Sequence, residues 1–112
     1  MEPVEVVEEF GAAWSAHDLD AVLRLVTDDC IFDATGPAPD GMRHVGHSAI
    51  RRAWEEIFSD ATSRFQPEET FAANDRVVQL WRYDWDGGHV RGVDVFRVRD
   101  GKVAEKLSYV KG

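Results

Sequence analysis

The chain has a single cysteine, Cys30, among its 112 residues. One cysteine excludes a disulfide within the chain and any metal site built from several thiolates. Cys30 stands in the apolar run Cys30-Ile31-Phe32, where a small buried thiol fits better than a reactive nucleophile.

Positive charge is also scarce, with 13 Lys and Arg against 21 Asp and Glu and a net charge of −8. The absence of a basic stripe argues against a nucleic-acid partner and against docking on an anionic membrane. No apolar run approaches the ~20 residues that span a bilayer. The N-terminal segment MEPVEVVEEF is acidic and amphipathic, unlike a signal peptide. We therefore expect a cytoplasmic protein.

Motifs for metals and cofactors are lacking as well. His44 and His47 flank Gly46 at the entry to a predicted helix, and their spacing has no acidic partner that would complete a metal site. A role in capping, in a loop or at the rim of a pocket fits them better. No glycine-rich phosphate loop follows a strand. We expect neither a metal nor a cofactor.

What the sequence does contain is a 44% hydrophobic fraction with four Trp and six Phe, which indicates one globular domain over residues 1–112. Apolar residues at helical spacing predict helices over residues 3–14, 18–26 and 47–58. Extended patterns separated by turn signals predict strands over residues 30–34, 64–73, 76–85, 89–99 and 102–110. Helices followed by antiparallel strands predict an α+β fold, with three N-terminal helices covering one face of a curved, mainly antiparallel sheet.

One acid interrupts an apolar strand face. Counting by twos from Val90 places Asp94 on the same face as Phe96 and Val98, whereas the neighbouring arginines point the other way. A carboxylate facing a core is costly unless it is hydrogen-bonded, is neutralised or opens onto a cavity. Asp94 is therefore a site candidate. The alternative is a solvated acid near a strand end, or one paired with a neighbouring arginine.

The loop at Asp86-Gly87-Gly88 predicts a hairpin that pairs Trp85 with Val90, Tyr83 with Gly92 and Trp81 with Asp94. Trp81, Tyr83, Asp94 and Phe96 would then share one face, as in the lining of a cavity.

The opposite face of this hairpin collects Leu80, Val93 and Val95. Leu107 and Tyr109 join this outer face if Asp100-Gly101 forms a three-residue bulged hairpin, and join the Asp94 face if the turn has two residues. An apolar outer face predicts a homodimer formed through it.

Three segments carry a resemblance to a known family. They are AWSAHDLDAV (13–22), TDDCIFD (27–33) followed by GHSAIR (46–51), and GVDVFRV (92–98) with DGKV (100–103). In their order and spacing they resemble the SnoaL-like, nuclear transport factor 2-like superfamily, which includes polyketide cyclases, ketosteroid isomerases and limonene epoxide hydrolase. The resemblance implies a cone-shaped α+β barrel with a deep pocket between helices and sheet, often dimeric.

The resemblance also implies roles for single residues. Asp94 lies in a segment similar to the one that holds a protonated aspartic acid in the isomerases, where it stabilises an oxyanion. The isomerase tyrosine falls on Phe10, and the general-base aspartate falls on Ala34, one residue from Asp33. Steroid isomerisation is therefore not expected. The pair Arg82 and Asp84 resembles part of the epoxide hydrolase site, but strand alternation turns both away from Trp81 and Tyr83.

These observations predict a protein that binds a small apolar or aromatic ligand. It could act as a cofactor-independent isomerase, cyclase or dehydratase by acid–base chemistry on a carbonyl compound. The candidate catalytic residues are Asp94, Asp33 and Tyr83. The candidate substrate-binding residues are the aromatic side chains Phe10, Trp14, Phe32, Trp54, Phe58, Trp81 and Phe96. The alternative is a non-catalytic ligand-binding or dimerisation module.

Overall fold

A computed structural model describes residues 1–111, which form three helices and six strands. The predicted helices and the predicted long strands are all present. The sequence pattern missed one short strand, and the strand predicted at residue 30 begins earlier. The helices are α1 (Pro3–Ser15), α2 (Leu19–Arg24) and α3 (His47–Phe58), and the strands are β1 (Val26–Asp33), β2 (Arg43–Val45), β3 (Arg64–Ala73), β4 (Arg76–Trp85), β5 (Gly88–Arg99) and β6 (Lys102–Val110).

Local chemistry sets the helix starts. Pro3 opens α1, where its missing N–H is not needed. The Asp18 carboxylate accepts a hydrogen bond from the Ala21 N–H at 3.1 Å and so caps α2. The cap of α3 is Gly46, with φ of +86°, because the chain turns sharply out of β2 in a conformation that favours glycine.

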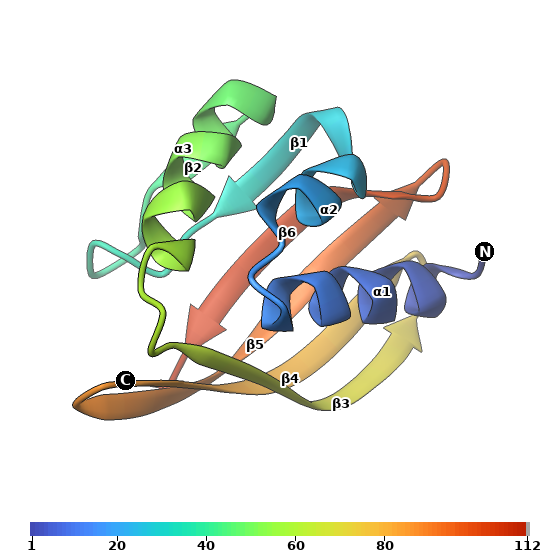
Figure 1. The fold of residues 1–112 in the computed structure, drawn as a ribbon. Coiled ribbons are helices and arrows are strands. Elements are labelled where there is room, and N and C mark those ends of the chain that lie inside the picture. Colours follow the sequence, from blue (N-terminus) through green and yellow to red (C-terminus); the bar gives the residue numbers. More distant parts are fainter. Residues whose placement is uncertain (112) are drawn as a thin grey trace.

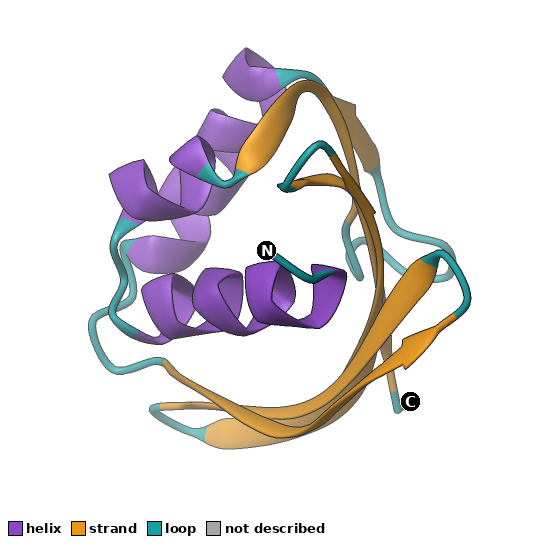
Figure 2. Cartoon of the chain, turned by 90° about the vertical axis from the view of Figure 1, so that its right-hand side faces the viewer, coloured by secondary structure: helices purple, strands orange, loops and turns teal. Residues whose placement is uncertain are grey.

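The described strands form one curved sheet in the order β2-β1-β6-β5-β4-β3. Neighbouring strands are antiparallel, except that β1 pairs with β6 in parallel. Figure 1 shows the three helices on one side of the sheet, and Figure 2 shows the sheet curving around α1. The predicted α+β fold is confirmed.

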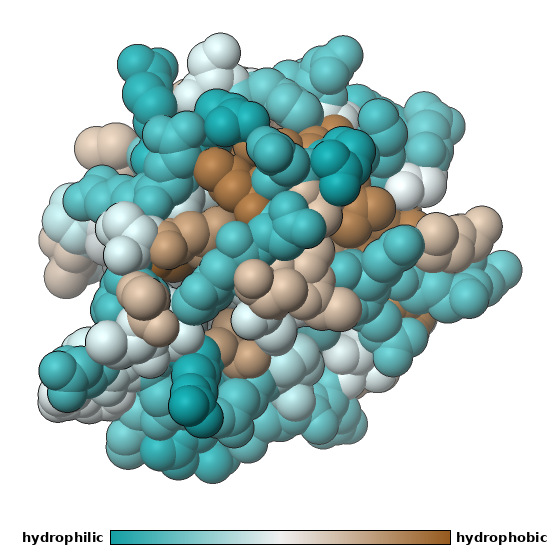
Figure 3. Space-filling view, viewed as in Figure 1, coloured by the Kyte–Doolittle hydropathy of each residue, from teal (hydrophilic) through white to brown (hydrophobic). Residues whose placement is uncertain are grey.

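The core lies between the helices and the concave face of the sheet. It includes Val6 and Phe10 of α1, Trp54 of α3 and Phe96 of β5. Cys30 is fully buried there, and burial raises the pKa of its thiol to about 12, as expected of a structural cysteine. On the helical side of the molecule, apolar side chains show mainly in hollows between hydrophilic ones (Figure 3). No helix of residues 1–111 is long and apolar enough to cross a membrane.

The predicted register of the β4–β5 hairpin was wrong by two residues. Its turn is Asp86-Gly87, with Gly87 at φ of +109°, so Gly88 belongs to β5 and pairs with Trp85. Trp81 therefore pairs with Gly92 rather than with Asp94. A shift of two keeps every side chain on its predicted face, so Trp81 and Asp94 are diagonal neighbours on the concave side.

The β5–β6 hairpin combines the two geometries that the sequence left open. Its turn has two residues, because Arg99 pairs with Lys102, but the register then shifts. Val98 pairs with Val103 and Arg97 with Glu105, which leaves Ala104 as an extra residue on β6. This bulge inverts the alternation that follows it.

After the bulge, Leu107 pairs with Val95 and Tyr109 with Val93, both on the outer face of the sheet. Lys106 and Ser108 therefore point to the concave side.

Candidate functional site

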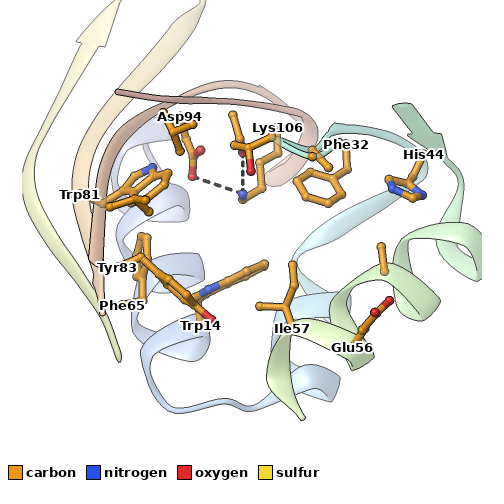
Figure 4. Close-up of a pocket in the computed structure, with 17 residues that line it drawn as sticks. Trp14, Phe32, His44, Glu56, Ile57, Phe65, Trp81, Tyr83, Asp94 and Lys106 are labelled. Atoms are coloured by element: carbon orange, nitrogen blue, oxygen red, sulfur yellow. Dashed lines mark hydrogen bonds and ion pairs between the residues drawn. The ribbon is translucent and has the colours of Figure 1, made fainter. Parts of the chain in front are cut away.

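A cavity of about 400 Å³ lies between the concave face of the sheet and the helices. Much of its wall is aromatic, from Trp14, Phe32, Phe65, Trp81 and Tyr83. Its polar lining consists of Thr35, His44, Glu56, Asp94, Lys106 and Ser108. Figure 4 shows Asp94 beside Trp81 and Lys106, with His44 and Glu56 across the cavity.

The chemical centre of the cavity is an ion pair between Asp94 and Lys106. The Lys106 Nζ lies 3.3 Å from Asp94 Oδ2 and donates a hydrogen bond to Ser108 Oγ at 3.0 Å. The two charged side chains are 2% and 8% exposed, for Asp94 and Lys106 respectively. Strand register brings them together, because Asp94 pairs with Ser108 and Phe96 with Lys106. Asp94 is therefore paired with a lysine and not with a neighbouring arginine.

The Lys106 ammonium is also held by aromatic rings. Its Nζ lies 4.8 Å from the centroid of Trp14 and 4.8 Å from that of Phe32. The negative faces of these rings attract a cation, and the attraction strengthens where water is excluded. Phe32 is in turn stacked on His44, with centroids 5.6 Å apart. One wall of the cavity thus fixes the position of the positive charge.

Two buried polar atoms of the cavity residues have no hydrogen-bond partner among the described residues. They are Asp94 Oδ1 and Trp81 Nε1. The ion pair with Lys106 is made through the other oxygen of Asp94, Oδ2. A carboxylate with one oxygen held by an ammonium and the other free can accept a hydrogen bond or a proton from a bound molecule.

The structure divides the predicted aromatic residues into two groups. Trp14, Phe32 and Trp81 line the cavity. The other predicted aromatic residues, Phe10, Trp54, Phe58 and Phe96, do not line it.

The second group is occupied by contacts within the protein. Phe10 packs edge-on against both Trp54 and Phe96, at 5.7 and 5.6 Å, and Phe58 packs against Trp14 at 4.8 Å. These rings form the layer behind the cavity wall.

The predicted catalytic residues are also divided. Tyr83 lines the cavity with Asp94, but Asp33 does not, and Ala34 takes the inward position. Strand β1 has no bulge at this end, so alternation turns Phe32 inward and Asp33 outward. The Arg43 guanidinium donates to both oxygens of Asp33, at 2.7 and 2.9 Å, and holds the pKa of that carboxyl below its usual value. Asp33 therefore lies outside the cavity, apart from Asp94.

Sequence reasoning missed Lys106, the partner of Asp94. A signal for it was present, because the bulged hairpin that places Leu107 and Tyr109 outside must place Lys106 and Ser108 inside. It also missed Phe65 and Glu56.

Two further predictions concerned the histidines beside Gly46 and the pair of Arg82 and Asp84. Of the two histidines beside Gly46, His44 reaches the cavity, whereas a ring nitrogen of His47 lies 3.3 Å from the Val26 carbonyl oxygen. Arg82 and Asp84 form an ion pair with each other, and neither lines the cavity with Trp81 and Tyr83, as the alternation predicted.

Metal ligands do not gather in the part of the chain that the structure describes. Residues 1–111 contain no group of three or more His, Cys, Asp or Glu side chains that could hold an ion. The polar groups that line the cavity are the carboxylates of Asp94 and Glu56, the Lys106 ammonium, the His44 imidazole and the hydroxyls of Thr35, Tyr83 and Ser108.

Comparison with known proteins shows what the chain is similar to. Residues 7–106 match the family described as SnoaL-like domain. A nuclear transport factor 2-like protein of unknown function from Mesorhizobium loti shares 42% identity over 96% of this chain and 89% of its own, with a TM-score of 0.86. A search of curated proteins found no match.

Two proposed polyketide cyclases share the fold. The one from Sinorhizobium meliloti is 23% identical over 94% of both chains, with a TM-score of 0.81. The one from Pseudomonas putida is 21% identical over 99% of this chain and 92% of its own, with a TM-score of 0.78. At these identities the similarity establishes the fold and not the reaction.

Proposed function

We propose that this chain, which belongs to the SnoaL-like domain family of nuclear transport factor 2-like proteins, binds a small, mostly apolar carbonyl compound in the cavity. It then catalyses the transfer of a proton to or from the bound compound. The observation that carries this proposal is the buried Asp94–Lys106 pair in an aromatic-lined cavity. Isomerase, cyclase and dehydratase reactions all use such a proton transfer beside a carbonyl group.

Asp94 is the proposed base. An ammonium 3.3 Å from its carboxylate stabilises the ionised form, which can remove a proton from the carbon next to the carbonyl group. This role differs from the one that the family resemblance implied, in which the aspartic acid donates to the oxyanion.

Lys106 is the proposed hydrogen-bond donor to the substrate. Its ammonium can donate to the substrate oxygen on which negative charge develops. Low exposure strengthens this interaction, because little water competes with it.

The aromatic wall would orient the substrate. Trp14, Phe32 and Trp81 present flat surfaces on different sides of the cavity and favour a ligand with a ring system. Tyr83 lines the same cavity and is the proposed second hydrogen-bond donor.

Proton exchange in heavy water tests this proposal. A panel of aryl and cyclic ketones is incubated with the protein, and NMR measures the loss of the signal from the protons next to the carbonyl group. We expect Asp94→Asn to slow the exchange by about 100-fold or more. Lys106→Met should slow it as well. Asp33→Asn is the matched control, since Asp33 points away from the cavity, and should exchange like the wild type.

The remaining outcomes separate the two candidate classes. Ketones that bind without any exchange would identify a non-catalytic ligand-binding module. Exchange that survives Asp94→Asn would contradict the assignment of the base. If no compound of the panel changes the melting temperature or the tryptophan fluorescence, the cavity does not take such ligands.

We also propose that two copies pair through the outer sheet face. On that face Phe71, Leu80 and Tyr109 are 42%, 36% and 57% exposed, and Val93, Val95 and Leu107 lie between them. The ion pairs of Arg82 with Asp84 and of Arg97 with Glu105 border this apolar area. An apolar centre with a charged rim is typical of an interface between subunits.

A further inference from the structure

The two unpartnered atoms of the cavity are a donor and an acceptor. Trp81 Nε1–H can only donate a hydrogen bond, and the free oxygen of Asp94 can only accept one while the carboxylate is ionised. Both residues are almost fully buried, with 7% and 1% exposure. Buried polar groups in folded proteins are normally hydrogen-bonded, so two exceptions in one cavity require an explanation.

The fold places the two groups side by side. Trp81 pairs with Gly92 on β5, two residues from Asp94, and both side chains point to the concave face. Figure 4 shows the nitrogen edge of the Trp81 indole turned toward the Asp94 carboxylate.

Gly92 makes this position of the indole possible. A Cβ at Gly92 would lie 2.6 Å from Trp81 Cζ2 and 2.4 Å from the Tyr109 carbonyl oxygen. The indole therefore rests on bare backbone beside Asp94.

The charges around these atoms limit what can bind there. Asp94 and Lys106 neutralise each other, so this end of the cavity favours a neutral group. An anion would be repelled by the free Asp94 oxygen, and a cation would be repelled by the Lys106 ammonium. A carbonyl or ether oxygen could accept from Trp81 but would leave the Asp94 oxygen without a donor.

We infer that the ligand carries a neutral hydroxyl group at this end of the cavity. The hydroxyl donates its hydrogen to Asp94 Oδ1 and accepts a hydrogen bond from Trp81 Nε1–H. This inference rests on the proposed function, because it concerns the same cavity. It narrows the ligand class to ring-containing carbonyl compounds that also carry a hydroxyl group, such as hydroxy ketones.

Two probes that differ in one hydrogen-bond donor test the inference. 2-Naphthol carries the hydroxyl, and 2-methoxynaphthalene keeps the ring and the acceptor oxygen but lacks the donor. At pH 7 the naphthol is protonated, since phenols ionise near pH 10. Titration calorimetry should give about 10- to 100-fold tighter binding for the naphthol, as expected for a hydrogen bond to a charged group.

Trp81→Phe removes the donor and keeps an aromatic ring. It should weaken naphthol binding about fivefold and change the binding of the methyl ether little. Trp54→Phe is the matched control, because Trp54 Nε1 is also buried without a partner but Trp54 does not line the cavity. If Trp81→Phe does not fold, Asp94→Asn serves instead. It should reduce the preference for naphthol to a few-fold, since an amide oxygen is a weaker acceptor.

Each result decides the question. Equal affinity of the wild type for both probes would overturn the inference and leave the proposed ligand binding intact. An equal loss of both probes in Trp81→Phe would mean that Trp81 acts by shape alone, which also overturns it. If neither probe binds while ketones of the panel do, the inference is wrong and the proposed function stands, whereas failure of the probes and of the whole ketone panel would overturn both.

Discussion

Two carboxylates of this protein, Asp94 and Asp33, each pair with a basic side chain from a neighbouring strand, yet their surroundings are opposite. Asp94 and Lys106 are 2% and 8% exposed, whereas Asp33 and Arg43 are 30% and 59% exposed. The exposed pair has the better geometry, with two short hydrogen bonds, but water screens it. The buried pair loses its hydration and leaves one oxygen unpartnered. An ion pair of this kind thus contributes little to stability at the surface. In the cavity it costs desolvation free energy and forms a reactive centre.

The largest expected effect is the difference in stability between removing the basic partner of the buried pair and removing that of the exposed pair. Lys106→Met leaves the Asp94 carboxylate buried without a counter-charge, and we expect it to lower the free energy of unfolding by about 3–5 kcal/mol. Arg43→Met is the matched change at the surface and should lower it far less, because water solvates Asp33. Urea unfolding followed by circular dichroism measures both. Similar losses for the two variants would contradict the distinction drawn here.

Removing both buried charges should restore much of that loss. A buried ion pair can often be replaced by apolar side chains without loss of stability. We expect Asp94→Leu combined with Lys106→Met to unfold within about 1–2 kcal/mol of the wild type, and to lose proton transfer entirely. A double variant as unstable as Lys106→Met alone would show that the pair serves the fold rather than the chemistry.

The two faces of the sheet can be compared in the same way, because the concave face lines the cavity and the outer face is the proposed dimer interface. If the outer face joins two copies, Val95→Arg places two like charges across a symmetric interface and should yield a monomer. Light scattering should then report one chain mass for the variant and about twice that mass for the wild type. Asp86→Asn changes the net charge by the same +1 at the exposed turn between β4 and β5 and should stay dimeric. A monomeric wild type would contradict the proposed interface.

The smallest effect concerns the pH dependence of the surface pair. Because Arg43 lowers the pKa of Asp33 in the folded protein, this carboxylate stabilises the fold above the unfolded value of about 3.9. That contribution, about 0.2–1 kcal/mol, is lost as the pH falls through the lower folded value. Asp33→Asn should flatten this part of the acid unfolding curve, measured between about pH 5 and 2. An unchanged curve would mean that the pairing adds nothing to stability.

The sequence by itself determined the elements and the faces of their side chains. Helical spacing predicted the three helices, and alternation placed Asp94, Trp81 and Tyr83 on one face of the sheet even though the predicted register was wrong by two residues. The reason is that a period of two or 3.6 is a property of the local chain, which an even shift in register does not change.

Only the tertiary structure decided which side chains these faces contact. The extra residue Ala104 inverts the alternation at the end of β6 and brings Lys106 to Asp94. The depth of packing places four aromatic rings in the layer behind the cavity rather than in its wall, namely Phe10, Trp54, Phe58 and Phe96. Asp33 faces Arg43 because β2, which the sequence pattern did not indicate, lies beside it. Register shifts and packing depth depend on contacts between distant segments, and a local period carries no information about them.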